Sequence, residues 1–140
     1  MLKKMFCTFL LLMFCALLHA QATLEVKVNN ISSSKGNILF ALFNQPDGFP
    51  KTPEKAFALK EMKAVKGEIS AVFQGLPAGT YALAVFHDAN GDGKLNSNAI
   101  GIPKEDYGFS NNARPMFSAP EFSDARFAFT RELKIVIRVN

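Results

Sequence analysis

A short acidic segment of the sequence carries the residue types and the spacing of a calcium-binding loop. Asp88, Asn90 and Asp92 alternate along it, and Gly93 follows directly. Calcium loops of the EF-hand type place oxygen ligands at positions 1, 3, 5, 7, 9 and 12, with glycine at position 6 for the sharp turn. Counting from Asp88 as position 1, the candidate ligands are Asp88, Asn90, Asp92, the carbonyl of Lys94 and Asn96.

The same segment departs from an EF-hand at its far end. Position 12, where a bidentate acid should complete the shell, is Ala99, and the upstream segment has the pattern of a strand rather than a helix. A looser site on a β scaffold could draw the missing oxygens from Asn98, Glu105 or Asp106. Alternatively, the Asn-Gly and Asp-Gly pairs here are those most favoured in tight turns. A calcium-stabilised loop over residues 88–98 and a turn without metal both stay open.

The rest of the chain offers little for catalysis. His87 is the only histidine after residue 22, and both cysteines precede that point, so a catalytic zinc site of three protein ligands is not expected. The sequence contains no Gly-x-Ser-x-Gly elbow, phosphate loop or dinucleotide fingerprint. A hydrolase of periplasmic or cell-surface polymers is an alternative function. Its residues would be His87, Asp88, Asp92 and Glu105. The sequence favours a non-catalytic protein.

Aromatic side chains beside glycine form a second group of candidates. Tyr107 and Phe109 flank a glycine in a stretch without regular periodicity. The phenylalanines elsewhere in the chain are expected to fill the core. For a bound ligand the candidate contacts are His87, Tyr107, Phe109, Asn111, Asn112 and Arg114. The alternative is that the loop residues of this set fix the loop to the domain and that His87 is a hydrogen-bonded residue at the edge of the core.

The first 22 residues have the layout of a secretory signal peptide. Two lysines precede an apolar run from Met5 to Leu18, and small residues end at Ala22. The run is shorter than the roughly 20 apolar residues that a spanning helix needs. We expect residues 1–22 to be cleaved, with cleavage after Ala20 as the other option. The protein is then exported, periplasmic or secreted, with no stable membrane insertion after cleavage.

The charge of the chain argues against nucleic acid as a partner. The whole sequence has a net charge of +4, and without Lys3 and Lys4 the balance falls to 14 basic against 12 acidic side chains, or +2. No lysine or arginine cluster remains that could follow a phosphate backbone. We therefore expect a small ligand or a component of the cell envelope.

The elements that must position these residues are short strands. Alternation over residues 23–29 and 133–139 predicts two strands with one face each in a core. Residues 37–43 and 80–86 are apolar on both sides, as in central strands. Residues 68–73 precede the second of these, and the Gly-Leu-Pro-Ala-Gly connection predicts a hairpin between the two.

The remaining segments complete an all-β prediction. Helical turns are expected at residues 53–56 and 123–126, the first leading into an edge strand and the second into another strand. Residues 96–119 have no sustained period but keep apolar side chains, which predicts one long ordered loop. Residues 23–140 are thus expected to form a single β-sandwich, immunoglobulin-like or transthyretin-like, with about seven short strands. A structural subunit that associates through edge strands is a further alternative function.

Two blocks of residues carry a family resemblance. The first is His-Asp-x-Asn-Gly-x-Gly-Lys-Leu at residues 87–95, and the second is Gly-Ile-Pro-Lys-Glu-x-Tyr-Gly-Phe-Ser-Asn-Asn at residues 101–112. Together with the FNQPDGFP and FQGLPAGTYALAVF segments, they resemble the bacterial exported family known as domain of unknown function 2141. That family has no established activity, so the resemblance implies a small exported β-sandwich and no catalytic residue. It suggests that the two blocks fold together, with the acidic loop near Glu105 and the asparagine pair.

Overall fold

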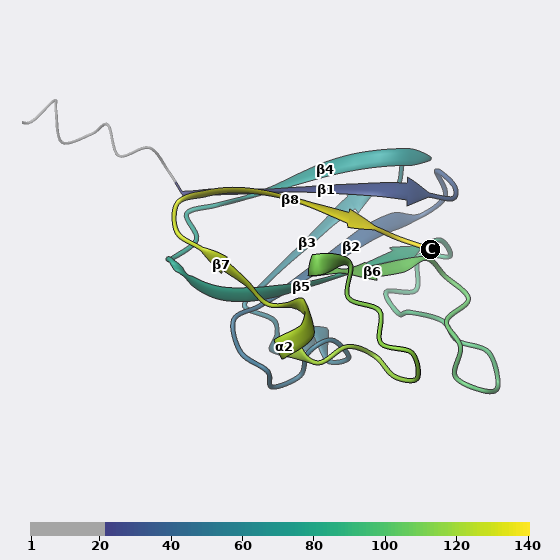
Figure 1. The fold of residues 1–140 in the computed structure, drawn as a ribbon. Helices are drawn as coiled ribbons and strands as arrows, with labels where there is room; N and C mark the ends of the chain where they lie inside the picture. Colours follow the sequence, from purple (N-terminus) through teal and green to yellow (C-terminus); the bar gives the residue numbers. More distant parts are fainter. Residues whose placement is uncertain (1–21) are drawn as a thin grey trace, which may run out of the picture.

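The computed structural model describes residues 22–140, which form two packed β-sheets (Figure 1). The predicted signal peptide lies outside the described residues except for its last position. The strands are β1 (Thr23–Ile31), β2 (Asn37–Phe43), β3 (Ala58–Lys63), β4 (Gly67–Gln74), β5 (Gly79–Asp88), β6 (Tyr107–Phe109), β7 (Phe127–Phe129) and β8 (Glu132–Arg138). The helical turns in this part of the chain are η1 (Pro53–Lys55), η2 (Ser110–Asn112) and α2 (Phe122–Ala125). No helix of residues 22–140 is long and apolar enough to cross a membrane. The predicted all-β sandwich is confirmed.

The sheets differ in how their strands are ordered. Sheet A has the order β4-β1-β8, in which β1 is antiparallel to β4 and parallel to β8. Sheet B has the order β3-β2-β5-β6. In addition, β7 pairs with β5 at residues 79–81, whereas β6 pairs with it at residues 84–86. Leu83 therefore lies between two separate pairings of the same strand.

The main core lies between the sheets and follows the alternation of the sequence. Leu24, Val26 and Val28 of β1 are fully buried, as the pattern predicts. In the last strand Ile137 is fully buried, while Val136 points the other way and is exposed. Burial of such aliphatic side chains is the main source of stability in a domain of this size.

A second apolar cluster explains why β2 and β5 are apolar on both sides. Their outward side chains are covered by the segment at residues 44–57 and by α2. The ring of Phe49 meets those of Phe43, Phe109 and Phe122 edge-on, at centroid distances of 5.3, 6.2 and 6.0 Å. Edge-to-face contacts of this kind add to the stability gained from burial. The outer face of sheet B is thus partly a second core.

The hairpin predicted between residues 68–73 and 80–86 is wrong. The first segment belongs to β4 and pairs with β1 in sheet A, whereas the second belongs to β5 and pairs with β2 in sheet B. The glycine and proline residues between them do reverse the chain, but the reversal crosses from one sheet to the other. A turn sequence fixes a change of direction and not the strand that is paired afterwards.

The single long loop predicted at residues 96–119 is interrupted in the structure. Residues 107–109 form β6, and η2 follows at once. A strand of three residues is too short to show a period, so the sequence could not reveal it. The helical turns predicted near residues 53–56 and 123–126 are confirmed as η1 and α2, and each leads into the expected strand.

Candidate functional site

The acidic loop begins where β5 ends, and its first carboxylate holds it closed. Asp88 is only 2 % exposed. Its Oδ1 accepts the backbone N–H groups of Gly91 and Asp92 at 2.9 and 3.1 Å, and its Oδ2 accepts that of Gly93 at 2.7 Å. Both glycines have positive φ, +77° and +74°, which other residues rarely adopt. The Asp88 side chain therefore acts as the acceptor around which the turn folds.

Asp92 collects a second set of donors on the exposed side of the loop. Its Oδ1 accepts the backbone N–H of Lys94 at 2.9 Å. Its Oδ2 accepts the side-chain amides of Asn96 at 3.1 Å and Asn90 at 3.3 Å. These hydrogen bonds, the one from the Lys94 backbone first, lower the pKa of the Asp92 carboxyl.

Glu105 joins the two sequence blocks that carry the resemblance. Its Oε1 accepts the backbone N–H of Ala89 at 3.1 Å. Its Oε2 accepts the backbone N–H of Asn96 at 2.9 Å and the side-chain amide of the same residue at 3.2 Å. The expected approach of Glu105 to the acidic loop is confirmed, whereas the asparagine pair at residues 111–112 lies elsewhere, as described below.

The carboxylate oxygens of this loop are engaged with N–H donors. A cation would have to share or replace hydrogen bonds at Asp88, Asp92 and Glu105. Within residues 22–140, no group of three or more His, Cys, Asp or Glu side chains is placed to hold a metal ion. Calcium at residues 88–98 stays a prediction from the spacing.

His87 lies on the inner side of the same strand end. Its side chain is buried, and its Nε2 lies 2.6 Å from the carbonyl oxygen of Lys35. Because a carbonyl only accepts, Nε2 carries a proton in this contact. Its Nδ1 lies 3.7 Å from Oδ2 of Asp106. The imidazole thus connects β5 to the turn after β1, as the alternative for His87 described.

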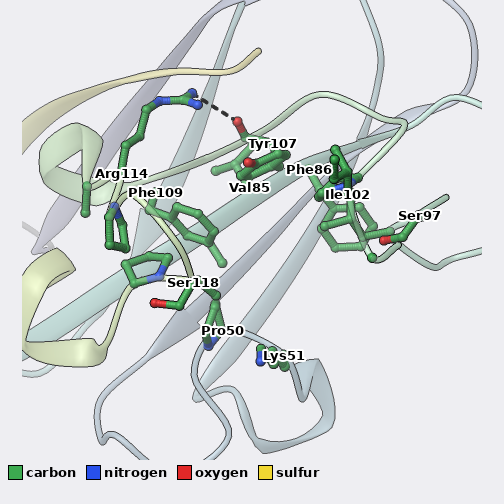
Figure 2. Close-up of a pocket in the computed structure, with 18 of the residues that line it drawn as sticks. Pro50, Lys51, Val85, Phe86, Ser97, Ile102, Tyr107, Phe109, Arg114 and Ser118 are labelled. Carbon is green, nitrogen blue, oxygen red and sulfur yellow. Dashed lines mark hydrogen bonds between the residues drawn. The ribbon is translucent and has the colours of Figure 1, made fainter. Parts of the chain in front are cut away.

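An open groove of about 910 Å³ lies on the outer side of sheet B (Figure 2). Side chains of β5 and β6, including Phe86, Tyr107 and Phe109, line its floor. Three connecting segments form the walls, at residues 50–54, 93–103 and 113–120. Figure 2 shows residues of all three segments around the aromatic floor. The groove is therefore built by parts of the chain that are far apart in sequence.

Three of the predicted ligand contacts line this groove, namely Tyr107, Phe109 and Arg114. The Nη2 of Arg114 donates to the carbonyl oxygens of Arg138 at 3.1 Å and Tyr107 at 3.4 Å, the latter drawn in Figure 2. The guanidinium carbon lies 5.7 Å from the centre of the Tyr107 ring. Such a cation–π contact holds the Arg114 side chain against the aromatic floor while part of this side chain stays exposed.

A comparison with known protein families identifies the family of this chain. A family model described as "Uncharacterized protein conserved in bacteria (DUF2141)" matches residues 26–136. The chain belongs to the DUF2141 family. No curated protein and no solved structure matches it. The matched residues include the acidic loop, β6 and all three walls of the groove, so both candidate sites of this DUF2141 domain lie inside the family region.

Asn111 and Asn112 turn away from the groove and hold the DUF2141 domain together. Both adopt left-handed backbone conformations, with φ of +59° and +49°. The Asn111 amide donates to the Arg126 carbonyl at 2.8 Å, and the Asn112 Oδ1 accepts the backbone N–H of Arg138 at 2.8 Å. These two predicted ligand contacts, together with His87, lie outside the residues that line the groove.

Several residues that line the groove were not predicted from the sequence. Lys51 lies in a segment for which only a helical turn was predicted, and Met116 and Phe117 lie in the predicted long loop. Ile102 belongs to the same missed set. A signal was available, because large apolar side chains in a segment rich in Asn, Gly, Pro and Ser either find a core or stay exposed for a partner.

Proposed function

We propose that this DUF2141 protein is an exported, non-catalytic binding module that holds a small amphiphile in the groove on sheet B. The amphiphile has an apolar body and an anionic group. The observation that carries the proposal is the combination of an aromatic floor with cationic walls in one groove. Its volume of about 910 Å³ falls within the range of small-molecule sites.

The apolar part of the proposal rests on the floor. The rings of Tyr107 and Phe109 meet edge-on at 5.7 Å, which fixes their positions before a ligand arrives. Phe86 and Ile102 line the same groove and lie close to each other in Figure 2. A hydrocarbon chain or an aromatic body placed here removes apolar surface from water. This burial stabilises the complex by roughly 25 cal/mol for each Å² of apolar surface.

The anionic part rests on the charge of the walls. Lys51, Lys94 and Arg114 line the groove, against Glu54 as the acid among the lining residues that the structure describes. In residues 22–140, none of these three cations forms a salt bridge. Lys94 does interact with the nearby Asp92 charge, which lies on the exposed side of the acidic loop. The excess of positive charge favours a carboxylate, sulfate or phosphate group on the ligand.

The non-catalytic part rests on where the acids are. The residues that the hydrolase alternative would use are not among the lining residues, namely His87, Asp88, Asp92 and Glu105. Their oxygens and nitrogens are committed to hydrogen bonds within the fold. A general acid and base must reach a substrate within hydrogen-bond distance. This arrangement supports binding over hydrolysis.

The edge strands give less support to the structural-subunit alternative. β3 lies at one edge of sheet B and carries Lys60 and Lys63. Lysines on an edge strand oppose the addition of a further strand. The Lys60 ammonium also donates a hydrogen bond to the carbonyl oxygen of Val72 in β4. This contact joins the edge strand β3 of sheet B to the edge strand β4 of sheet A.

The test is calorimetric titration of residues 23–140 with dodecanoate below its micellar concentration. Dodecyltrimethylammonium, with the same chain and the opposite charge, is the matched control ligand. We expect dodecanoate to bind and the cation to bind at least tenfold more weakly. The double variant Lys51→Glu, Lys94→Glu should weaken dodecanoate binding by about tenfold, which corresponds to roughly 1.4 kcal/mol.

Lys63→Glu, on the edge strand β3, is the matched control variant, because Lys63 is exposed and is not among the residues that line the groove. Equal binding of the two ligands, or equal weakening by the variants, would contradict the proposal. A lack of dodecanoate binding by a cooperatively unfolding protein would contradict it as well.

A further inference from the structure

The acidic loop contains the one Asn-Gly pair of the sequence, Asn90-Gly91. In such a pair the backbone nitrogen of glycine can attack Cγ of the asparagine, because glycine has no side chain to hinder the approach. A bond forms between this nitrogen and Cγ, the bond from Cγ to Nδ2 breaks, and ammonia leaves with the proton of the glycine N–H. Water then opens the cyclic imide to aspartate or isoaspartate. Both residues are exposed, so water reaches the pair.

The nitrogen that would attack is held by a carboxylate. The Gly91 N–H donates to Oδ1 of Asp88 at 2.9 Å, and the Asp88 side chain is buried. The attack needs a nitrogen that has lost its proton. A carboxylate at this distance opposes a second negative charge on the amide, because like charges disfavour each other's ionised form. The Gly91 nitrogen is therefore protected from reaction while the loop is closed.

The side chain that would be attacked is held at both ends. Oδ1 of Asn90 accepts the backbone N–H of Asp92 at 3.1 Å, and Nδ2 of Asn90 donates to Oδ2 of Asp92 at 3.3 Å. Ring closure removes Nδ2 as ammonia, so the second of these hydrogen bonds must break during the reaction. Both reacting groups thus have hydrogen-bond partners in the closed loop, although both residues are exposed.

We propose that Asn90 is a site of spontaneous deamidation and that Asp88 suppresses the reaction. Deamidation proceeds only when the loop opens and the Gly91 N–H leaves the Asp88 carboxylate, so its rate measures the open fraction of the loop. Loops open locally in this way without unfolding of the whole domain. This modification goes beyond the proposed ligand binding and does not depend on it, because neither Asn90 nor Gly91 is among the residues that line the groove.

Deamidation leaves a permanent change in the loop. Where the product is aspartate, a carboxylate oxygen replaces the donor Nδ2, which lies at hydrogen-bond distance from the Asp92 carboxylate. Two carboxylates this close repel each other. The loop continues into Gly93, Lys94 and Leu95, which line the groove. The modification therefore loosens one wall of the groove.

The test is peptide mass spectrometry of residues 23–140 after incubation at neutral pH, both folded and unfolded in urea. EDTA is present in both samples, so that no metal ion competes for the Asp88 carboxylate. We expect Asn90 to deamidate about tenfold more slowly, or slower still, in the folded domain, which corresponds to roughly 1.4 kcal/mol of loop closure. A hydrogen bond to a charged acceptor can supply this difference. Equal rates in the two samples would overturn the proposal.

Asp88→Ala removes the acceptor and should raise the deamidation rate of the folded domain by about tenfold or more. Ser110→Ala is the matched control. It removes buried hydrogen bonds to Leu83 and Ala125 and lowers the stability of the whole domain, but it leaves the hydrogen bonds of the loop in place. The rate at Asn90 should stay unchanged in this control. An equal rise in both variants, or no rise in Asp88→Ala, would overturn the role of Asp88.

Hydrogen exchange of the unchanged protein tests the proposal without a variant at Asp88. The Gly91 N–H should exchange more slowly than in the urea-unfolded chain, and exchange at the same rate would overturn the proposal. Asn90→Asp, which reproduces one product of deamidation, tests the loosening of the loop. It should speed the exchange of the Gly93 N–H, which donates to Oδ2 of Asp88 at 2.7 Å. Unchanged exchange at Gly93 would contradict the loosening.

Discussion

Oδ2 of Asp88 accepts the backbone N–H of Gly93 across five residues at 2.7 Å, and this hydrogen bond closes the acidic loop. Asp88→Ala removes the acceptor for three N–H groups. We expect a loss of about 2–4 kcal/mol in the free energy of unfolding, since each stranded donor costs roughly 1–3 kcal/mol and some will reach water. Urea denaturation measures it. Asp92→Ala, on the exposed side of the loop, is the matched control and should cost less than about 1 kcal/mol. Equal losses would contradict a central role for Asp88.

If residues 88–98 form a turn without metal, calcium should leave the thermal midpoint unchanged. The oxygens of Asp88 and Asp92 already accept N–H donors, and a bound ion would have to compete with them. The measurement is thermal unfolding in millimolar calcium and in EDTA. A site filled at 100 times its Kd would add about 2.7 kcal/mol and raise the midpoint by several degrees. If calcium does raise the thermal midpoint and Asp92→Asn removes the rise, residues 88–98 bind calcium as their spacing predicts.

Ser110→Ala should destabilise the domain by about 1–3 kcal/mol. The fully buried Oγ of Ser110 accepts the backbone N–H of Leu83 at 2.9 Å, in the gap between the β6 and β7 pairings, and donates to the Ala125 carbonyl at 2.5 Å. Without it, a buried donor and a buried acceptor lose this partner. Chemical denaturation measures the change. Ser118→Ala, an exposed serine, should stay within about 0.5 kcal/mol.

Gly108→Ala should be poorly tolerated. A Cβ at this position would lie 2.7 Å from the Arg138 carbonyl oxygen and 2.8 Å from Cγ2 of Ile137. β6 would have to move away from the end of β8, and we expect a loss of about 1–3 kcal/mol in the free energy of unfolding, typical of an overpacked core. Gly79→Ala is the matched control, because its Cβ would meet only the Tyr81 ring, at 3.8 Å. Thermal midpoints of the two variants that agree within a degree would contradict the packing argument.

The phenol of Tyr81 should ionise late. Burial raises the pKa of Tyr81 above its usual value of about 10. A raised pKa in the folded state means that the related stability is fully present below pH of about 10 and is lost as pH rises through the folded value. Absorbance titration should show this late step, and Tyr81→Phe should remove it. Above pH of about 10, Tyr81→Phe should lose less stability with rising pH than the unchanged protein does. A late step that persists in Tyr81→Phe would contradict the assignment.

How far the sequence predicts the structure depends on the range of the interactions involved. Alternation placed β1 and β8, because a strand with one buried face records that burial every second residue. Strand pairing is set by tertiary packing, so the turn residues between β4 and β5 do not reveal that these strands belong to different sheets. For the same reason the sequence does not predict that residues 50–54 and 113–120 line one groove. Asp88 was ambiguous for a chemical reason, since the same carboxylate oxygens serve a cation or a backbone turn.

The parallel pairing of β1 with β8 sets the order in which the domain can be completed. Thr23 faces Glu132, so β1 finds one of its two neighbours only when β8, more than 100 residues further along the chain, is available. Loop closure over such a distance is slow, and folds with many distant pairings fold in milliseconds to seconds. A chain that emerges from its amino terminus therefore keeps sheet A unfinished until residues 132–138 are released. Removing β8 should leave β1 with an open edge and a strong tendency to aggregate.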